Sequence, residues 1–373
     1  MDLERKISIH FKRTMSLLLA IGVVLAAAPL WADAEWDKIV AAAKKEGKVS
    51  VIGPQGTETK DALTLAFQKK HPDIRIEFNG MSGSAVTAKV LNEQGARKYL
   101  VDVAVTGTTT GITGLLPANA LIPIKTHLVG PNSRDGSAWI GKKFTFADNA
   151  RQYVIVMSAY VKAPFIYNSE LVDASTIKSW KDLLDPKWKG KLALRDPTRP
   201  GGGLGNATLW YITPSLGEEY IRQLFSQNPV VSGNDRQILD FVAKGKSPIG
   251  IGPSDVLTNE LIGRGLPLKH FNPADMKEGT YITAGNGALV AMKNPPHPNA
   301  VKVYLDFLLS AEGQYEWSKG AGFASMRTDV PHDHVLDILV PKEGMTYPQL
   351  SDEEFVSKRD EVVKILRPLM RRR

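Results

Sequence analysis

The stretch KVSVIGPQGTETKDALTLAFQKKHPDIRIEFNGMSGSAVTAKVLNEQGARKYLVDVAV, residues 48–105, alternates between two hydrophobic patterns. Short apolar or strictly alternating runs are typical of strands, whereas apolar side chains at helical spacing are typical of helices. The two patterns predict strands at 48–52, 74–78 and 101–105 and helices at 59–70 and 84–93. Because strands that alternate with helices form a largely parallel sheet covered on both faces, we expect an α/β fold.

Composition places the chain among ordinary globular proteins. It has 373 residues, a hydrophobic fraction of 43% and a charged fraction of 23%, and its length suggests about two domains. The absence of cysteine excludes disulfides, thiolate metal sites and cysteine nucleophiles. The formal net charge of +8 is mild and its charges are mixed along the chain, so we expect no nucleic-acid partner.

The N-terminus has the pattern of a secretory signal peptide, which we assign to residues 1–34. A basic start precedes an apolar run over 15–30 and the small-x-small sequence Ala32-Asp33-Ala34, which a signal peptidase reads. The apolar run is shorter than the roughly 20 residues of a comfortable membrane span, which makes an uncleaved anchor the weaker alternative. We therefore expect a soluble protein exported to a bacterial periplasm.

The middle of the chain predicts a second α/β lobe. Extended segments near 160 and 282 mark where the chain would enter that lobe and return from it, and strands at these crossings suit a hinge. The expected division is 35–160 plus 282–325 for the first lobe and 161–281 plus 326–373 for the second. A last helix is expected from 353 to about 366, where Pro368 should end it.

Glycine and small polar residues follow four of the predicted strands. They form turns at 53–57, 79–84, 106–111 and 196–203. A helix that begins after such a turn presents unpaired backbone N–H groups and a partial positive charge, which can bind an oxyanion. Ligands of open α/β sheets bind at the carboxyl ends of the strands. The alternative is that Thr57, Ser84 and Thr109 serve only as helix N-caps.

Other motifs give weaker signals. Arg199 lies in a Pro- and Gly-rich turn and could clamp a carboxylate or phosphate, although a solvated loop arginine is the alternative. Residues 201–205 have neither the spacing of a dinucleotide fingerprint nor the Gly-Lys of a phosphate-binding loop. His332-Asp333-His334 is expected to be solvated rather than to bind a metal, and no motif assigns a nucleophile or a base.

Four stretches resemble the periplasmic solute-binding proteins of ABC importers, in the group called iron(III)-binding or family 1. They are residues 40–49, 167–168 with 179–191, 196–203, and 296–300 with 307–314. The resemblance implies a type II periplasmic-binding-protein fold, in which two lobes close by a hinge on a solute held in the cleft between them. It also implies docking on a membrane permease with its ATPase, no enzymatic activity and no cofactor, and we expect a monomer.

The resemblance to iron-binding members is incomplete. Those members place adjacent tyrosines after a late strand of the second lobe, whereas here 248–252 leads into Pro253-Ser254-Asp255, and no adjacent tyrosine pair occurs in the chain. We therefore expect a small anionic or zwitterionic organic solute, such as a phosphonate, an organophosphate or a carboxylate. The candidate ligand-binding residues are Thr57, Ser82, Ser84, Thr108, Thr198, Arg199, Ser254, Asp255 and Asn286.

Three alternatives stay open. Asp255 could instead be the N-cap of a helix over 256–262. Ferric iron could be the ligand if isolated tyrosines such as Tyr153, Tyr160 and Tyr281 converge. An exported hydrolase that uses Asp196 or Asp255 is the third alternative, and the sequence offers little for it.

Overall fold

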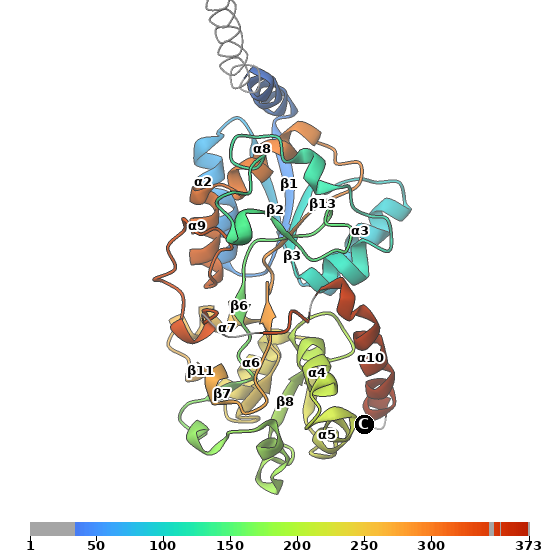
Figure 1. Cartoon of the computed structure of the whole chain (residues 1–373), viewed down its shortest axis with the longest axis vertical. Helices are drawn as coiled ribbons and strands as arrows, with labels where there is room; N and C mark the ends of the chain where they lie inside the picture. The colour runs from blue at the N-terminus through green and yellow to red at the C-terminus, as the bar shows by residue number, and fades with distance from the viewer. Residues whose placement is uncertain (1–33, 343–346, 351, 372–373) are drawn as a thin grey trace, which may run out of the picture.

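The computed structural model describes residues 34–342, 347–350 and 352–371, so the expected signal peptide lies outside the described residues except for Ala34. The chain folds into two lobes, one above the other in Figure 1, each with a central sheet flanked by helices. The expected α/β fold with two lobes is confirmed. Within the described ranges, no helix combines the length and the apolar character needed to cross a bilayer.

The first lobe is built on a six-stranded sheet. In spatial order its strands are β2 (Arg75–Gly80), β1 (Lys48–Gly53), β3 (Val103–Thr106), β13 (Ala288–Ala291), β5 (Ile155–Val156) and β4 (Thr145–Phe146). The strands β1, β2 and β3 are parallel, as expected, but β13 and β5 run antiparallel to their neighbours. Figure 1 shows α2 (Thr57–Lys70), α8 (Pro298–Leu308) and α9 (Ala311–Ala321) on one side of this sheet and α3 (Gly83–Gly95) on the other.

The second lobe has a five-stranded sheet. Its order is β11 (Leu268–His270), β7 (Ile166–Asn168), β10 (Ile249–Ile251), β8 (Leu192–Arg195) and β9 (Val230–Ser232). Its helices are α4 (Gly202–Ile212), α5 (Gly217–Ser226), α6 (Asp235–Ala243) and α7 (Asp255–Gly263). The last helix, α10 (Val356–Arg371), packs on α4 and α5. Because β8, β9 and β10 are parallel, their carboxyl ends lie together at one edge of the sheet.

Two short strands connect the lobes. β6 (Tyr160–Val161) and β12 (Ile282–Thr283) pair antiparallel and lie between the two larger sheets (Figure 1). Residues 34–46 are helical. The remaining elements are the π-helical turn η1 (Thr110–Leu115) and the 3₁₀ turns η2 (Ile124–His127), η3 (Ile140–Lys142), η4 (Ala174–Thr176), η5 (Trp180–Leu184), η6 (Pro186–Trp188), η7 (Pro273–Asp275), η8 (Asp337–Leu339) and η9 (Glu353–Phe355).

The C-terminal part of the chain packs on both lobes. The expected division assigns 326–373 to the second lobe, and Val362 and Leu366 are buried in its core. Met326 and Leu339 instead lie in the core of the first lobe. The expected end of the last helix before Pro368 is wrong, because α10 continues to Arg371. A proline inside a helix removes one backbone hydrogen bond, and packing of this last turn on the second core offsets that loss.

A buried histidine makes the stability of the second lobe depend on pH. His270 Nε2 lies 2.7 Å from Asn259 Oδ1, and burial lowers the pKa of His270 to about 4. Below about pH 6.5 this histidine therefore binds a proton in the unfolded chain but not in the folded chain. The contribution of His270 to the free energy of unfolding is fully present above that pH and is lost as the pH falls toward 4. Between pH 7.5 and 5.0 we expect this group to cost about 2 kcal/mol of the free energy of unfolding.

Urea unfolding of the wild-type protein and of His270→Gln at the two pH values measures this cost. The variant is expected to lose about 2 kcal/mol less than the wild type on acidification. His332→Gln, at an exposed loop histidine, is the matched control and should behave like the wild type. Equal losses in the wild type and His270→Gln would contradict the assignment.

Candidate functional site

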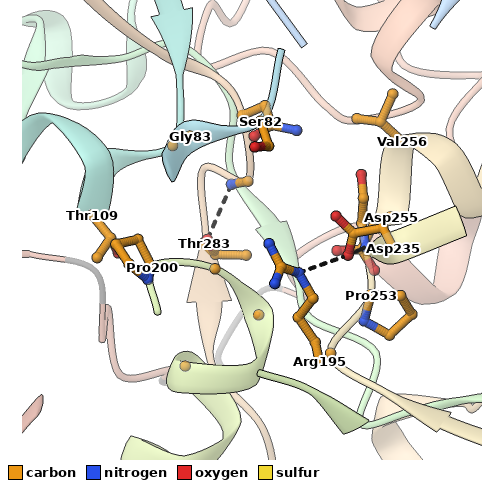
Figure 2. A pocket seen from close by; sticks show the side chains of 18 of the residues that line it. Ser82, Gly83, Thr109, Arg195, Pro200, Asp235, Pro253, Asp255, Val256 and Thr283 are labelled. Carbon is orange, nitrogen blue, oxygen red and sulfur yellow. Dashed lines mark hydrogen bonds and ion pairs between the residues drawn. The ribbon is translucent and has the colours of Figure 1, made fainter. Parts of the chain in front are cut away.

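A cavity of about 380 Å³ lies between the two lobes. Its wall consists mainly of turns that follow β1, β2 and β3 in the first lobe and β8, β9 and β10 in the second, with side chains from β6 and β12 (Figure 2). These turns contribute 54–55, 81–83, 107–110, 200–202, 204–205, 233–236 and 252–257. The cavity therefore occupies the carboxyl ends of the strands of both sheets, where ligands of open α/β sheets bind.

Four α-helices begin at the wall of the cavity, and they differ in how their N-termini are capped. Asn234 and Ser254 cap α6 and α7 with their own side chains, by accepting from Gln237 N and Leu257 N. At α3 and α4 the N-cap residues are Ser82 and Gly201, and within the described residues neither makes a side-chain capping bond. The first N–H groups of α3 and α4 are therefore free of side-chain caps at a cavity wall, as an anion site requires.

The glycines after β8 let α4 begin close to the strands. A Cβ on Gly203 would lie 2.1 Å from the carbonyl oxygen of Arg195, and one on Gly202 would lie 2.6 Å from that of Gly252. Gly201 has a φ of +135°, which L side chains rarely adopt. Glycine at these positions thus brings the N-terminus of α4 against the carboxyl ends of β8 and β10.

Arg195, the last residue of β8, places a buried guanidinium at the wall. Only 5% of the residue is exposed, and its Nε lies 3.0 Å from Asp235 Oδ1, an ion pair drawn in Figure 2. The same carboxylate oxygen accepts the backbone N–H of Ser254 at 3.1 Å. Burial raises the pKa of Asp235, and Arg195 opposes that effect. Arg195 Nη1 is buried without a hydrogen-bond partner in the described part of the chain, so it is available to a ligand oxygen.

A second buried ion pair joins the hinge to α7. Lys162, just after β6, pairs with Asp255 Oδ2 and donates to the carbonyl of Pro253 at 3.2 Å. Tyr160 donates its phenolic O–H to the same Asp255 oxygen at 2.7 Å. Burial and then the Asp255 charge raise the pKa of Tyr160 well above its usual value, and burial raises the pKa of Tyr281 as well. Both phenols are therefore held in their neutral form.

The structure brings together five of the nine residues expected to bind a ligand. The residues in the cavity lining are Ser82, Thr108, Ser254, Asp255 and Asn286. The residues outside it are Thr57, Ser84, Thr198 and Arg199. Ligand binding by each of the nine stays a prediction.

Local contacts explain why the other four lie outside. Arg199 has 60% of its side chain exposed and pairs with Asp196, and Thr198 donates to the same carboxylate at 2.7 Å. Ser84 lies inside the first turn of α3, with its hydroxyl 3.3 Å from that of Ser82. Thr57 is the first residue of α2, after the N-cap Gly56.

The structure also shows which of the candidate residues are helix N-caps. Ser254, rather than Asp255, is the N-cap of α7. Thr109 is the N-cap residue of η1 but makes no side-chain capping bond to a described residue, and Thr57 and Ser84 are not N-cap residues. The interpretation as ordinary caps is therefore wrong for Thr57 and Ser84, whereas Thr109 occupies a cap position without a capping bond to a described residue.

Sequence reasoning missed most of the charged groups of the site. These are Lys162, Arg195, Asp235, Arg236 and Arg359. Arg195 had a usable signal, because it directly follows a predicted strand and precedes a Gly-rich turn. Lys162 directly follows a hinge strand and Arg359 lies in the last helix, and at neither place does a local pattern mark a ligand-binding position.

The positions of the tyrosines and histidines give little support to a metal site. Tyr160 and Tyr281 line the cavity, whereas Tyr153 packs against the core of the first lobe. The His334 ring is 2.9 Å from the Ser318 hydroxyl, and His332 is exposed in its loop. Over the described ranges, no cluster of three or more His, Asp or Glu side chains is placed to hold a metal ion.

Comparison with known proteins identifies the class to which this fold and cavity belong. Residues 53–315 match the family model for bacterial extracellular solute-binding proteins. The chain therefore belongs to the bacterial extracellular solute-binding protein family.

Individual relatives are more distant. The chain is 28% identical over 169 residues to a protein of Salmonella typhimurium provisionally named as a 2-aminoethylphosphonate-binding periplasmic protein, a match that covers 44% of this chain and 50% of that protein. The chain thus spans about half the length of this curated relative.

Among solved structures, the fold resembles AfuA from Actinobacillus pleuropneumoniae with exogenous fructose 6-phosphate bound, with a TM-score of 0.68 and 18% identity. That likeness covers 85% of this chain and 97% of the other. It also resembles iron-bound HitA from Pseudomonas aeruginosa, with a TM-score of 0.62, 21% identity and coverage of 86% and 99%. At such identities these likenesses show the type II periplasmic-binding-protein fold alone.

Proposed function

We propose that this protein is the periplasmic solute-binding component of an ABC importer and that it captures a small anionic or zwitterionic organic solute. Phosphonates, organophosphates and carboxylates are the solute classes we expect. The observation that carries the proposal is that one interlobe cavity holds the Nη1 of buried Arg195 and two helix N-termini. Among the described residues, that Nη1 has no hydrogen-bond partner and those N-termini have no side-chain cap. Aligned N–H donors and a desolvated guanidinium together favour oxyanions.

The charge of the lining supports the same class. Four basic side chains line the cavity within the described residues (Lys162, Arg195, Arg236 and Arg359) against two carboxylates (Asp235 and Asp255). An excess of positive charge favours an anionic solute, and the carboxylates offer acceptors to an amino or hydroxyl substituent. The name of the Salmonella typhimurium relative, which refers to a zwitterionic phosphonate, agrees with this combination.

We also propose that capture occurs by hinge closure. The cavity wall draws on both lobes, which are joined by β6 and β12. A solute that contacts both walls makes more interactions in the closed state than in the open state, and this difference stabilises closure. The closed, loaded protein would then dock on the permease of its importer.

A thermal-shift screen tests the proposed solute class. The probes are 2-aminoethylphosphonate, fructose 6-phosphate, citrate, a polyamine and a ferric salt, each added to the purified protein without its signal peptide. A probe at 100 times its dissociation constant should stabilise the folded state by about 2.7 kcal/mol. We expect stabilisation by at least one phosphorus-containing or carboxylate anion and none by the polyamine, followed by saturable one-to-one binding without turnover in calorimetry.

Ferric iron is the second candidate because Tyr160 and Tyr281 line the cavity. Phenolate coordination would require the loss of protons that burial retains on both phenols. Titration with ferric citrate is therefore expected to give no visible phenolate-to-iron absorption band. A band that saturates at one iron per protein and disappears in Tyr160→Phe would favour iron over the organic solute.

A further inference from the structure

The C-terminal segment reaches the binding cavity with a charged side chain. Arg359, on α10, is only 3% exposed and lines the cavity together with the turns of both lobes. We propose that Arg359 is a solute-binding residue that holds the anionic group of the solute against the N-terminus of α3. The inference rests on the proposed function, since it assigns the anion end of the same cavity.

The position of Arg359 follows from its contacts across the cleft. Its Nη1 donates to Thr109 Oγ1 at 3.2 Å, and Thr109 is the N-cap residue of η1 in the first lobe. The beginnings of α3 and η1 are adjacent, because a Cβ on Gly83 would lie 2.2 Å from Thr110 Oγ1. The guanidinium therefore contacts the segment that lies against the start of α3, and we call Ser82, Gly83, Thr109, Thr110 and Arg359 the Arg359 corner.

The C-terminal segment is anchored to both lobes, which holds the guanidinium in place. The backbone N–H of Glu353 donates to Ala147 O at 3.0 Å, and Glu353 Oε2 accepts from Asn149 N at 2.7 Å, both in the first lobe. On the other side, α10 buries Val362 in the core of the second lobe. Arg359 Nη2 donates to the carbonyl of Asp352 at 3.0 Å, within the segment itself. A guanidinium fixed in this way is preorganised for a ligand.

The electrostatics of the corner suit an oxyanion. Burial lowers the pKa of Arg359 to about 10, so the guanidinium keeps its charge at neutral pH. A desolvated charge near the N-terminus of α3 attracts an anion more strongly than an exposed charge does. Figure 2 shows Thr109 on the side of the cavity opposite Asp235 and Asp255. A solute with its anionic group at the Arg359 corner would thus direct an amino or hydroxyl substituent toward those carboxylates.

Calorimetry on four proteins tests the assignment, with 2-aminoethylphosphonate and fructose 6-phosphate as the probes at pH 7.5. We expect Arg359→Gln to bind the probe about 10- to 100-fold more weakly than the wild type does, because a charged hydrogen bond is lost. Arg359→Lys keeps the positive charge but not the planar guanidinium, and it should lose less affinity than Arg359→Gln. The matched control is Arg367→Gln, at an exposed position of the same helix, which should bind within about 2-fold of the wild type.

A purely structural role for Arg359 is separated by two further measurements. The salt dependence of the dissociation constant should be shallower in Arg359→Gln, because one charge no longer contributes to anion binding. Arg359→Lys should regain part of both the affinity and the salt dependence. If Arg359→Gln does not fold, Arg359→Lys decides, because a residue that does not touch the anion would leave its affinity at the wild-type value.

The outcomes distinguish the two proposals. If the wild type binds neither of these probes nor citrate, the proposed solute class is wrong. If the wild type binds a probe and the Arg359 variants bind it equally well with unchanged salt dependence, the role of Arg359 is wrong while the proposed function stands.

Discussion

Replacement of Arg195 by glutamine is expected to weaken binding of the best anionic probe by about 100-fold or more. Two effects act in the same direction. The variant loses the guanidinium whose Nη1 is buried and unpartnered among the described residues, and it leaves the Asp235 carboxylate without its ion-pair partner at the same wall. An uncompensated carboxylate repels an anion across a short, poorly solvated distance. Calorimetry at pH 7.5, with circular dichroism to verify folding, measures the change.

Two variants make the interpretation of that loss specific. Arg199→Gln removes an arginine four positions away that is 60% exposed and pairs with Asp196, and we expect its affinity to lie within about 2-fold of the wild type. Arg195→Gln combined with Asp235→Asn removes the repulsive carboxylate and should recover part of the lost affinity. If Arg199→Gln lost its affinity for the probe and Arg195→Gln kept it, the turn at 196–203 would be the anion-binding element instead of Arg195.

The fold could be predicted from the sequence where local patterns are strong. The strands and helices of 48–105 follow from apolar spacing alone, because each element is long enough to show its period. The same reasoning located the polar turns, and Ser82 and Thr108 from these turns do line the cavity. These residues were predictable because a parallel strand order sends every carboxyl end to one edge of a sheet.

The charged part of the site was not predictable in the same way. Arg195 and Arg199 belong to the same strand-turn segment. Which of them reaches the cavity depends on where β8 ends, because Arg195, the last strand residue, is buried, whereas Arg199, in the turn, is exposed. Lys162 and Arg359 reach the cavity from elements far from the polar turns. Their positions result from packing between lobes, which leaves no periodic or spacing signal in the sequence.

The buried pair between Lys162 and Asp255 leads to the largest stability effect we expect. The two side chains are 3% and 4% exposed. Removal of the ammonium therefore leaves a carboxylate in a poorly solvated site, where, among the described residues, the Tyr160 hydroxyl still donates to it. Breaking a buried ion pair in this way typically costs about 3–5 kcal/mol. Lys162→Met is expected to lose a free energy of unfolding of that size, measured by urea denaturation at pH 7.5.

The double variant separates an unpaired charge from a loss of packing. Lys162→Met with Asp255→Asn keeps an acceptor for Tyr160 but removes the charge, and it should recover most of the stability, because a neutral pair avoids the desolvation cost. The surface pair of Lys48 and Glu77, 39% and 37% exposed, supplies the control, since Lys48→Met should cost less than about 1 kcal/mol. If Lys162→Met were as stable as Lys48→Met, the buried carboxylate would have to be solvated from the cavity. The ion pair would then be accessible to the solute, and Asp255 would act in selection of the solute without stabilising the hinge.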